Sequence, residues 1–220
     1  MQQLATSGFS KHPILRLLLT TVLLCCWGAV THATTISYTG TFTQDDQKEL
    51  ISFTTSSAGG VSLRTWGFGG GINAADDTIS AGGFAPIVSV FDSSDMLIGL
   101  AQAGVATCDG NSDPVTSFCW DILLDLMLPA GNYLAVLTQD DNSPLGPFLS
   151  DGFLRDGEGD FTGPNFLGFP SSFVLATGDQ RDGHWALDIN LPGNAAPEPG
   201  SLALLAGGLV ALARLRRRLS

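Results

Sequence analysis

Two pairs of adjacent aspartates recur in the same local sequence. The segment Phe42-Thr43-Gln44-Asp45-Asp46 is echoed by Leu137-Thr138-Gln139-Asp140-Asp141, which Asn142 follows. Each pair comes at the exit of a predicted strand, so the carboxylates are expected to meet at one end of a β domain. Calcium takes about six to eight oxygen ligands from carboxylates, carbonyls and water. The sequence therefore predicts a Ca²⁺ site at Asp45, Asp46, Asp140, Asp141 and Asn142, unless Asp-Asp simply ends strands and forms turns.

Two further acidic loops have the spacing with which an EF-hand loop begins. In Asp109-Gly110-Asn111-Ser112-Asp113 the sixth position is Pro114 rather than glycine, and the twelfth is Trp120 rather than glutamate, so the match fails. The segment Asp156-Gly157-Glu158-Gly159-Asp160 also lacks the rest of the motif. We expect both segments to be solvated loops.

Common catalytic motifs are absent from the sequence between the N-terminal apolar segment and the C-terminal tail. It contains no G-x-S-x-G, no H-E-x-x-H and no P-loop. His184 is expected to be structural, and Trp66, Trp120 and Trp185 are expected to pack in the core rather than stack on sugars. We expect no catalytic residues. The alternative is a secreted carbohydrate-active enzyme, because two carboxyl groups at a set separation can hydrolyse a glycosidic bond.

Cysteine usage fits an oxidising compartment. Cys25 and Cys26 lie in an N-terminal apolar segment, which leaves Cys108 and Cys119 at the ends of a short polar loop. Two cysteines this close in an exported domain predict a disulfide. On the chain-entropy argument such a bond stabilises the fold by about 3 kcal/mol.

The elements that must position these residues are strands. Apolar and β-branched runs recur at 36–43, 50–54, 61–66, 87–91, 96–98, 120–128, 133–138, 173–176 and 185–189, most of them bounded by Gly, Pro, Asn or Asp. Asp92-Ser93-Ser94-Asp95 is typical of a hairpin turn. No strong amphipathic helix interrupts the runs, although 121–128 could form two helical turns. The pattern predicts an all-β antiparallel β-sandwich, jelly-roll-like, flanked by an N-terminal signal helix and a C-terminal transmembrane helix.

The excess of acidic residues limits the kinds of partner that the protein can bind. The chain has 10 Lys and Arg against 21 Asp and Glu, and the segment 34–192 keeps only Lys48, Arg64, Arg155 and Arg181 against 20 acids, a net charge of about −16. Such a surface repels nucleic acid and anionic lipid. It suits divalent cations and keeps an exported protein soluble.

The N-terminus resembles a secretory signal peptide. Lys11 and Arg16 precede the apolar segment 17–27, and Thr31-His32-Ala33 is a plausible cleavage site. A lipoprotein signal is disfavoured because Leu24 stands before Cys25, where a lipobox has a small residue. We therefore assign residues 1–33 to a signal peptide.

The C-terminus combines a tripeptide, an apolar run and a basic end. Pro197-Glu198-Pro199 is followed by the apolar run 201–213 and then by Arg214, Arg216, Arg217 and Arg218. This run is shorter than the about 20 residues that span a bilayer, but arginine side chains can reach the headgroups. The arrangement resembles the PEP-CTERM sorting signal. The resemblance implies brief anchoring in the inner membrane, cleavage near the tripeptide by an exosortase-type membrane protease, and release to the cell surface or matrix.

A second resemblance covers nearly the whole segment between the termini. It rests on Thr41-Phe42-Thr43-Gln44-Asp45-Asp46, Gly82-Gly83-Phe84-Ala85-Pro86 with Phe91-Asp92-Ser93, Leu128-Pro129-Ala130-Gly131-Asn132-Tyr133 and Leu149-Ser150-Asp151-Gly152-Phe153. These motifs are similar to those of secreted proteins of the pre-peptidase C-terminal (PPC) type of β-sandwich. The resemblance implies a non-catalytic accessory or adhesion domain, with calcium in some relatives. Ala85 stands where that family usually has an acid, which weakens a metal ligand there.

Together these observations divide the chain into four parts: a signal peptide at 1–33, a β-sandwich at 34–192, a linker with the Pro-Glu-Pro motif at 193–200, and a membrane anchor with a basic end at 201–220. The expected function is binding, adhesion or a structural role at the cell surface or in a biofilm matrix. Extracellular polysaccharide is the expected partner, and no nucleic acid is expected.

Overall fold

The computed structural model describes residues 33–102, 112–193 and 208, and these residues form mostly strands. The strands are β1 (Thr34–Thr41), β2 (Lys48–Thr55), β3 (Gly59–Thr65), β4 (Gly71–Ile72), β5 (Thr78–Ile79), β6 (Pro86–Phe91), β7 (Leu97–Gln102), β8 (Leu123–Leu128), β9 (Gly131–Gln139) and β10 (His184–Leu191). Two short helical segments, η1 (Leu149–Asp151) and α2 (Thr162–Phe166), lie between β9 and β10.

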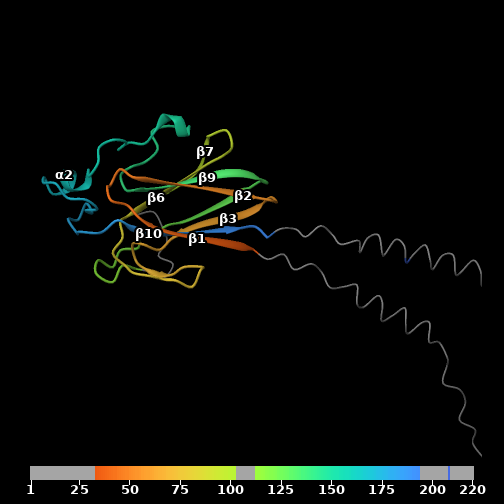
Figure 1. The fold of residues 1–220 in the computed structure, drawn as a ribbon, viewed down its shortest axis with the longest axis horizontal. Helices are drawn as coiled ribbons and strands as arrows, with labels where there is room; N and C mark the ends of the chain where they lie inside the picture. Colours follow the sequence, from red (N-terminus) through yellow and green to blue (C-terminus); the bar gives the residue numbers. More distant parts are fainter. Residues whose placement is uncertain (1–32, 103–111, 194–207, 209–220) are drawn as a thin grey trace, which may run out of the picture. The chain divides into compact units, whose positions relative to one another are not determined.

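Eight of the strands form two antiparallel four-stranded sheets. One sheet has the order β1-β10-β3-β8 and the other has the order β2-β9-β6-β7, while β4 and β5 form a separate small hairpin. Figure 1 shows the two sheets as the layers of a sandwich. Without the small hairpin, the eight long strands in chain order give sheets 1-8-3-6 and 2-7-4-5, which is the order of a jelly roll. The predicted antiparallel, jelly-roll-like sandwich is confirmed.

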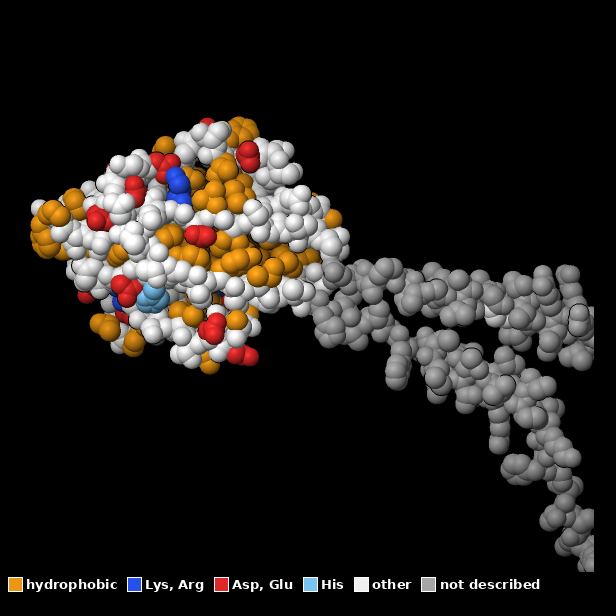
Figure 2. Space-filling view, in the orientation of Figure 1, with side chains coloured by type: hydrophobic (Ala, Val, Ile, Leu, Met, Phe, Trp, Pro, Cys, Tyr) orange, Lys and Arg blue, Asp and Glu red, His pale blue; other side chains and the backbone are white. Residues whose placement is uncertain are grey.

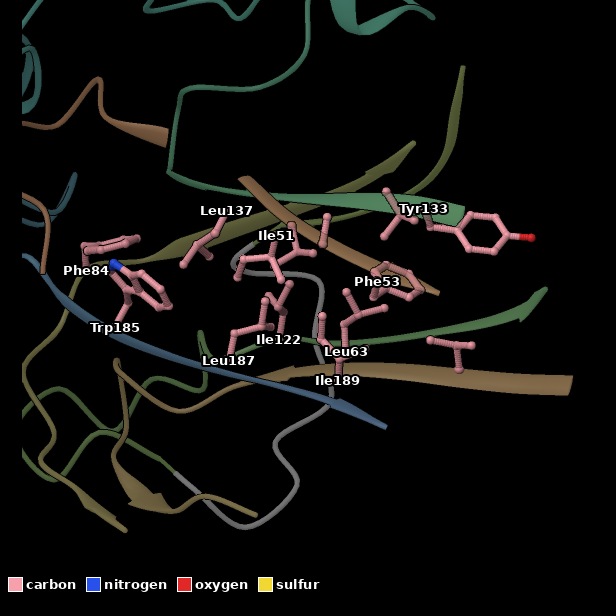
Figure 3. Packing of buried hydrophobic residues seen from close by; sticks show 14 of the residues in the cluster. Ile51, Phe53, Leu63, Phe84, Ile122, Tyr133, Leu137, Trp185, Leu187 and Ile189 are labelled. Carbon is pink, nitrogen blue, oxygen red and sulfur yellow. The ribbon is translucent and has the colours of Figure 1, made fainter. Parts of the chain in front are cut away.

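The core lies between the sheets because alternate residues of each strand face inward. In β2, Ile51 and Phe53 are buried whereas Leu50 and Ser52 are exposed. Figure 3 shows inward-facing residues of one sheet meeting those of the other. The labelled members of this cluster are Ile51, Phe53, Leu63, Phe84, Ile122, Tyr133, Leu137, Trp185, Leu187 and Ile189. The predicted core position of Trp185 is thereby confirmed.

The long connections and the short turns between strands lie at opposite ends of the sandwich. Thr34 pairs with Leu191 at one end of its sheet and Thr41 pairs with His184 at the other. The connections 42–47, 66–85, 103–122 and 140–183 all leave strands at the Thr41–His184 end, which we call the loop end. The short turns between β2 and β3 and between β8 and β9 lie at the opposite end, where β1 begins and β10 ends.

One predicted strand is wrong. Residues 173–176 do not form a strand, and Val174 makes only an isolated bridge with Gln180. The Phe173 N–H donates to the Asp45 carboxylate and the Val174 N–H donates to the Thr162 hydroxyl. These backbone groups therefore bind side chains instead of a neighbouring strand. The ambiguous segment 121–128 contains the strand β8 (Leu123–Leu128) rather than a helix, as predicted.

The predicted terminal helices lie outside the described residues, apart from Gly208. Within the part of the chain that the structure describes, no helix is long and apolar enough to cross a bilayer.

Candidate functional site

The loop end brings the segments that carry the two aspartate pairs together. The Asn142 side-chain amide donates to the backbone carbonyl of Asp46 (Nδ2···O 3.3 Å), although the residues are 96 positions apart. Asn142 also accepts from the backbone N–H of Arg155 (2.8 Å). The expected convergence of the segments after β1 and β9 is therefore present at these residues.

Asp45 binds backbone donors rather than solvent. Its side chain is fully buried, and its carboxylate accepts from the Thr162 N–H (2.8 Å), the Thr162 hydroxyl (2.5 Å) and the Phe173 N–H (2.6 Å). Burial raises the pKa of Asp45 against the lowering effect of these hydrogen bonds. Asp45 thus fixes the connection between β9 and β10 onto the loop after β1.

Asp46 and Asp141 also have partners within the protein. The Asp46 carboxylate accepts from the Gly159 N–H (Oδ2···N 2.9 Å). The Asp141 carboxylate forms an ion pair with Arg155 (Oδ2···Nη2 2.7 Å), whose guanidinium also contacts Glu158 and lies over the Phe161 ring. Both carboxylates hold the segment that follows β9.

Asp140 differs from its neighbours. Its backbone N–H donates to the Ala85 carbonyl, but its half-buried carboxyl has no hydrogen-bond partner among the described residues. Burial, together with the negative charge of Asp141, raises the pKa of Asp140 to about 6. Of the five residues predicted to bind calcium, Asp140 keeps the carboxyl group most available to a ligand.

The calcium prediction is not decided by these contacts. In the described part of the chain, no group of three or more His, Cys, Asp or Glu side chains is arranged to hold a metal ion. Most of the oxygens that the sequence offered to calcium already accept hydrogen bonds from the protein. Ca²⁺ at Asp45, Asp46, Asp140, Asp141 and Asn142 stays a prediction.

A buried ion pair at the loop end was missed by sequence reasoning. Nη1 of Arg181 lies 3.1 Å from Oδ1 of Asp113, and both side chains are buried. Arg181 also donates to the carbonyls of Gly83 (3.0 Å) and Phe68 (2.7 Å) and lies over the Phe68 ring. The expectation that Asp113 lies in a solvated loop is wrong, because its side chain is buried. The positive charge of Arg181 compensates the buried negative charge. The available signal was the rarity of basic residues, which makes each one a candidate partner for a buried acid.

Two more aspartates bind loop backbone in the same way. Asp121 accepts from the N–H groups of Phe68 (3.1 Å) and Gly69 (2.7 Å). Asp188 accepts from the Trp66 indole (2.7 Å) and the Ala74 N–H (2.9 Å). These carboxylates replace the backbone pairing that long loops lack. Much of the acidic composition of the loops is therefore architectural.

His184 lies at the start of β10 beside Asp182. Its ring Nδ1 contacts the Asp182 carboxylate, and Nε2 lies 2.8 Å from the Ser80 carbonyl. The contacts join β10 to the connection that contains β4 and β5. Trp66 and Trp120 are half-buried, and Trp120 stacks on Phe118.

The remaining predicted residues fall largely outside the described region. Cys119 is disulfide-bonded, but Cys108 is not among the described residues, so the pairing of these two cysteines stays a prediction. Also outside the described residues are Pro197, Glu198 and Pro199 of the sorting motif and the basic residues Arg214, Arg216, Arg217 and Arg218.

Comparison with known proteins identifies the tail. Residues 195–218 match the family model described as the PEP-CTERM protein-sorting motif. No curated protein matches the chain. The match covers the predicted tripeptide, the apolar run and the basic end. The chain therefore carries a signal for processing by exosortase, a membrane protein, and for sorting to the cell surface or extracellular space.

Proposed function

We propose that this protein is exported through its signal peptide, is anchored briefly by its apolar C-terminal segment, and acts after release as a non-catalytic binding or adhesion domain. The observation that supports the proposal is the sorting motif at residues 195–218, which begins shortly after β10 ends at Leu191. Cleavage near Pro197-Glu198-Pro199 would free the β-sandwich from its anchor and would leave all the described strands in the released part.

The sorting step is tested by following both ends of the chain. The full chain is expressed in a host that contains an exosortase, with one epitope tag in the turn between β2 and β3 and a second after Ser220. We expect the first tag at the cell surface or in the medium and the second only in cells. Intact precursor with its arginines in the medium would contradict the proposal.

Two matched variants locate the signal. Glu198→Ala should keep both tags together in the membrane fraction, because the recognition tripeptide is changed. Pro192→Ala, which lies outside the motif, should be processed like the natural chain.

Binding rather than catalysis is supported by the contacts of the loop-end acids. Asp45, Asp46, Asp121 and Asp188 accept hydrogen bonds from loop backbone, and Asp113 is ion-paired. A glycosidase would need a pair of carboxyl groups free to act on a substrate. The fold alone does not decide this, because one fold hosts many functions.

The partner that we propose is extracellular polysaccharide, in line with the cell-surface or extracellular destination that the sorting motif implies. Incubation of the released protein with matrix polysaccharide from the host should retain the protein on the polymer and release no new reducing ends. New reducing ends would favour the alternative, a carbohydrate-active enzyme. Neither retention nor cleavage would favour a purely structural matrix protein.

A further inference from the structure

The outer faces of the two sheets differ in polarity. On the β1-β10-β3-β8 sheet, Ser37, Asp188 and Asn190 point outward and make polar contacts. On the β2-β9-β6-β7 sheet, Phe91 and Val136 point outward, yet both are fully buried. Another part of the chain must therefore cover this second face.

That cover is the segment 143–156, which we call the strap. Phe153 of the strap packs on Phe91 and Val136 in a separate apolar cluster. The strap is fixed to the β6–β7 hairpin, because the Leu97 N–H at the start of β7 donates to the Pro147 carbonyl (2.8 Å). The inner side of the strap thus completes the fold.

The outer side of the strap is apolar as well. Pro144 and Phe153 form an antiparallel bridge. Because side chains alternate between the two sides of an extended chain, we expect the adjacent Leu145 and Leu154 on the side opposite Phe153. Leu145 is 60% exposed and Leu154 is 42% exposed. Phe148 forms a bridge with Met96, and both are nearly half exposed.

We call the four exposed residues Met96, Leu145, Phe148 and Leu154 the apolar patch. They belong to one hydrogen-bonded unit instead of being scattered singly over the surface. Clustered exposed apolar residues mark interaction sites more often than isolated ones do. Figure 2 shows that hydrophobic side chains on the drawn face are accompanied by many acidic side chains and few basic ones.

The rim of the apolar patch is negative. The Asp92 carboxylate accepts from the Met96 N–H (3.1 Å), and the Asp151 carboxylate accepts from the Phe148 N–H (2.9 Å). Asp95 is exposed beside them, and its carbonyl accepts from the strap at Leu149. None of these three carboxylates has a Lys or Arg partner in the described ranges.

The cations of the neighbourhood are already paired. Lys48 contacts Asp156, and Arg155 contacts Asp141 and Glu158. A partner that covers the apolar patch would therefore bring its own positive charge. Anionic polymers and anionic lipid surfaces would be repelled by the rim.

We propose that the apolar patch and its rim (Asp92, Asp95 and Asp151) are a docking surface for a cationic, apolar polypeptide segment of a partner protein. Leu145 and Phe148 provide the apolar contact, and the three carboxylates attract Lys or Arg side chains of the segment. The inference rests on the proposed binding function but adds a second partner class, distinct from polysaccharide. It does not depend on sorting by the tail.

The probe is a fluorescent peptide of alternating lysine and leucine that carries a photo-crosslinking group, and the control probe has glutamate in place of lysine. Each is mixed with the full chain in a neutral detergent, and affinity is measured by anisotropy. We expect the lysine peptide to bind and to crosslink within residues 92–100 and 143–156. Its affinity should fall as salt is added, because exposed charges are screened.

Matched variants test the surface itself. Leu145→Ser with Phe148→Ser should weaken binding about ten-fold, as expected when apolar anchors are removed. The control, Phe166→Ser with Phe169→Ser, removes two other exposed aromatic residues and should change nothing. Asp95→Asn with Asp151→Asn should weaken binding and reduce its salt dependence, whereas Asp125→Asn on β8 should not.

Three results would overturn the docking surface. The first is equal affinity of Leu145→Ser with Phe148→Ser and of Phe166→Ser with Phe169→Ser for the lysine peptide. The others are crosslinks spread over the domain, or an affinity for the glutamate peptide equal to that for the lysine peptide. Each of these results leaves the sorting proposal intact, because processing is read from the two epitope tags. Failed processing with site-specific peptide binding would leave the docking surface standing. Circular dichroism of every variant checks that the sandwich has folded.

Discussion

The side chains of Arg181 and Asp113 form an ion pair that is buried at the loop end, with exposed fractions of 4% and 1%. Through the other contacts of Arg181, the pair joins three long connections: that before β8, that between β3 and β6, and that before β10. The loop end is therefore held by a charge pair as well as by apolar packing. Removal of one partner would leave a buried charge without compensation.

Arg181→Met should lower the free energy of unfolding by about 3–5 kcal/mol, the usual cost of breaking a buried ion pair. Arg181→Met combined with Asp113→Asn should cost less than the single change, because no uncompensated charge remains. Lys48→Met removes a partly exposed pair with Asp156 and should cost about 1 kcal/mol or less. Urea unfolding of the three variants measures the differences. Equal losses for Arg181→Met and Lys48→Met would show that the buried pair is not important.

The same pair makes stability depend on pH in acid. Burial opposes the ionisation of Asp113, but hydrogen bonds from Thr116 and the contact with Arg181 outweigh it and lower the pKa of Asp113. Its contribution is present above the pKa of the unfolded chain, about 3.9, and is lost as pH falls through the lower folded value. The melting temperature should therefore decrease as the pH drops below about 4, and this decrease should be smaller in Arg181→Met with Asp113→Asn.

Asp140 should make the stability of the fold depend on pH in the opposite sense to Asp113. Its folded pKa of about 6 lies above the unfolded value of about 3.9, so the folded state binds more protons between these values. The free energy of unfolding should fall as pH rises through this window. Asp140→Asn should match the natural chain near pH 4 and be more stable at pH 7. Melting temperatures from pH 4 to 8 test this, and Asp125→Asn controls for net charge. A constant difference at all pH values would contradict the assignment.

Calcium, if it binds at the two aspartate pairs, should bind better above pH 6, where Asp140 is ionised. Millimolar Ca²⁺ should then raise the melting temperature, because a ligand of the native state stabilises it. Asp140→Asn should abolish the shift. Asp125→Asn should leave it unchanged. No shift at pH 7 would remove the calcium prediction and leave the loop-end aspartates with their hydrogen-bonding role alone.

The predicted disulfide between Cys108 and Cys119 can be read directly. A non-reduced digest of the released protein should give a linked peptide pair that contains these two cysteines. Cys108→Ser should lower the free energy of unfolding by about 3 kcal/mol on the chain-entropy argument. A linkage of Cys119 to another cysteine would show that the sequence spacing was misleading.

The sequence by itself determined the class of the fold and the destination of the protein. Alternating apolar residues, as in Leu50 to Thr54, define strands because side chains alternate between faces with a period of two. The sorting motif could be read because it acts as a short linear segment next to an apolar run. Both signals are local, so they need no knowledge of distant contacts. The convergence of Asp46 and Asn142 was also foreseen, since both segments leave predicted strands.

Only the tertiary structure decided what the acidic side chains do. Asp45 binds Thr162 and Phe173, and Asp113 binds Arg181, across long stretches of sequence. The predicted strand at 173–176 does not form, and the N–H groups of Phe173 and Val174 donate to the side chains of Asp45 and Thr162 instead of to a neighbouring strand. A carboxylate looks alike in sequence whether it faces water, a metal ion or backbone donors. Its role depends on burial and on partners that are brought together only when the loops pack.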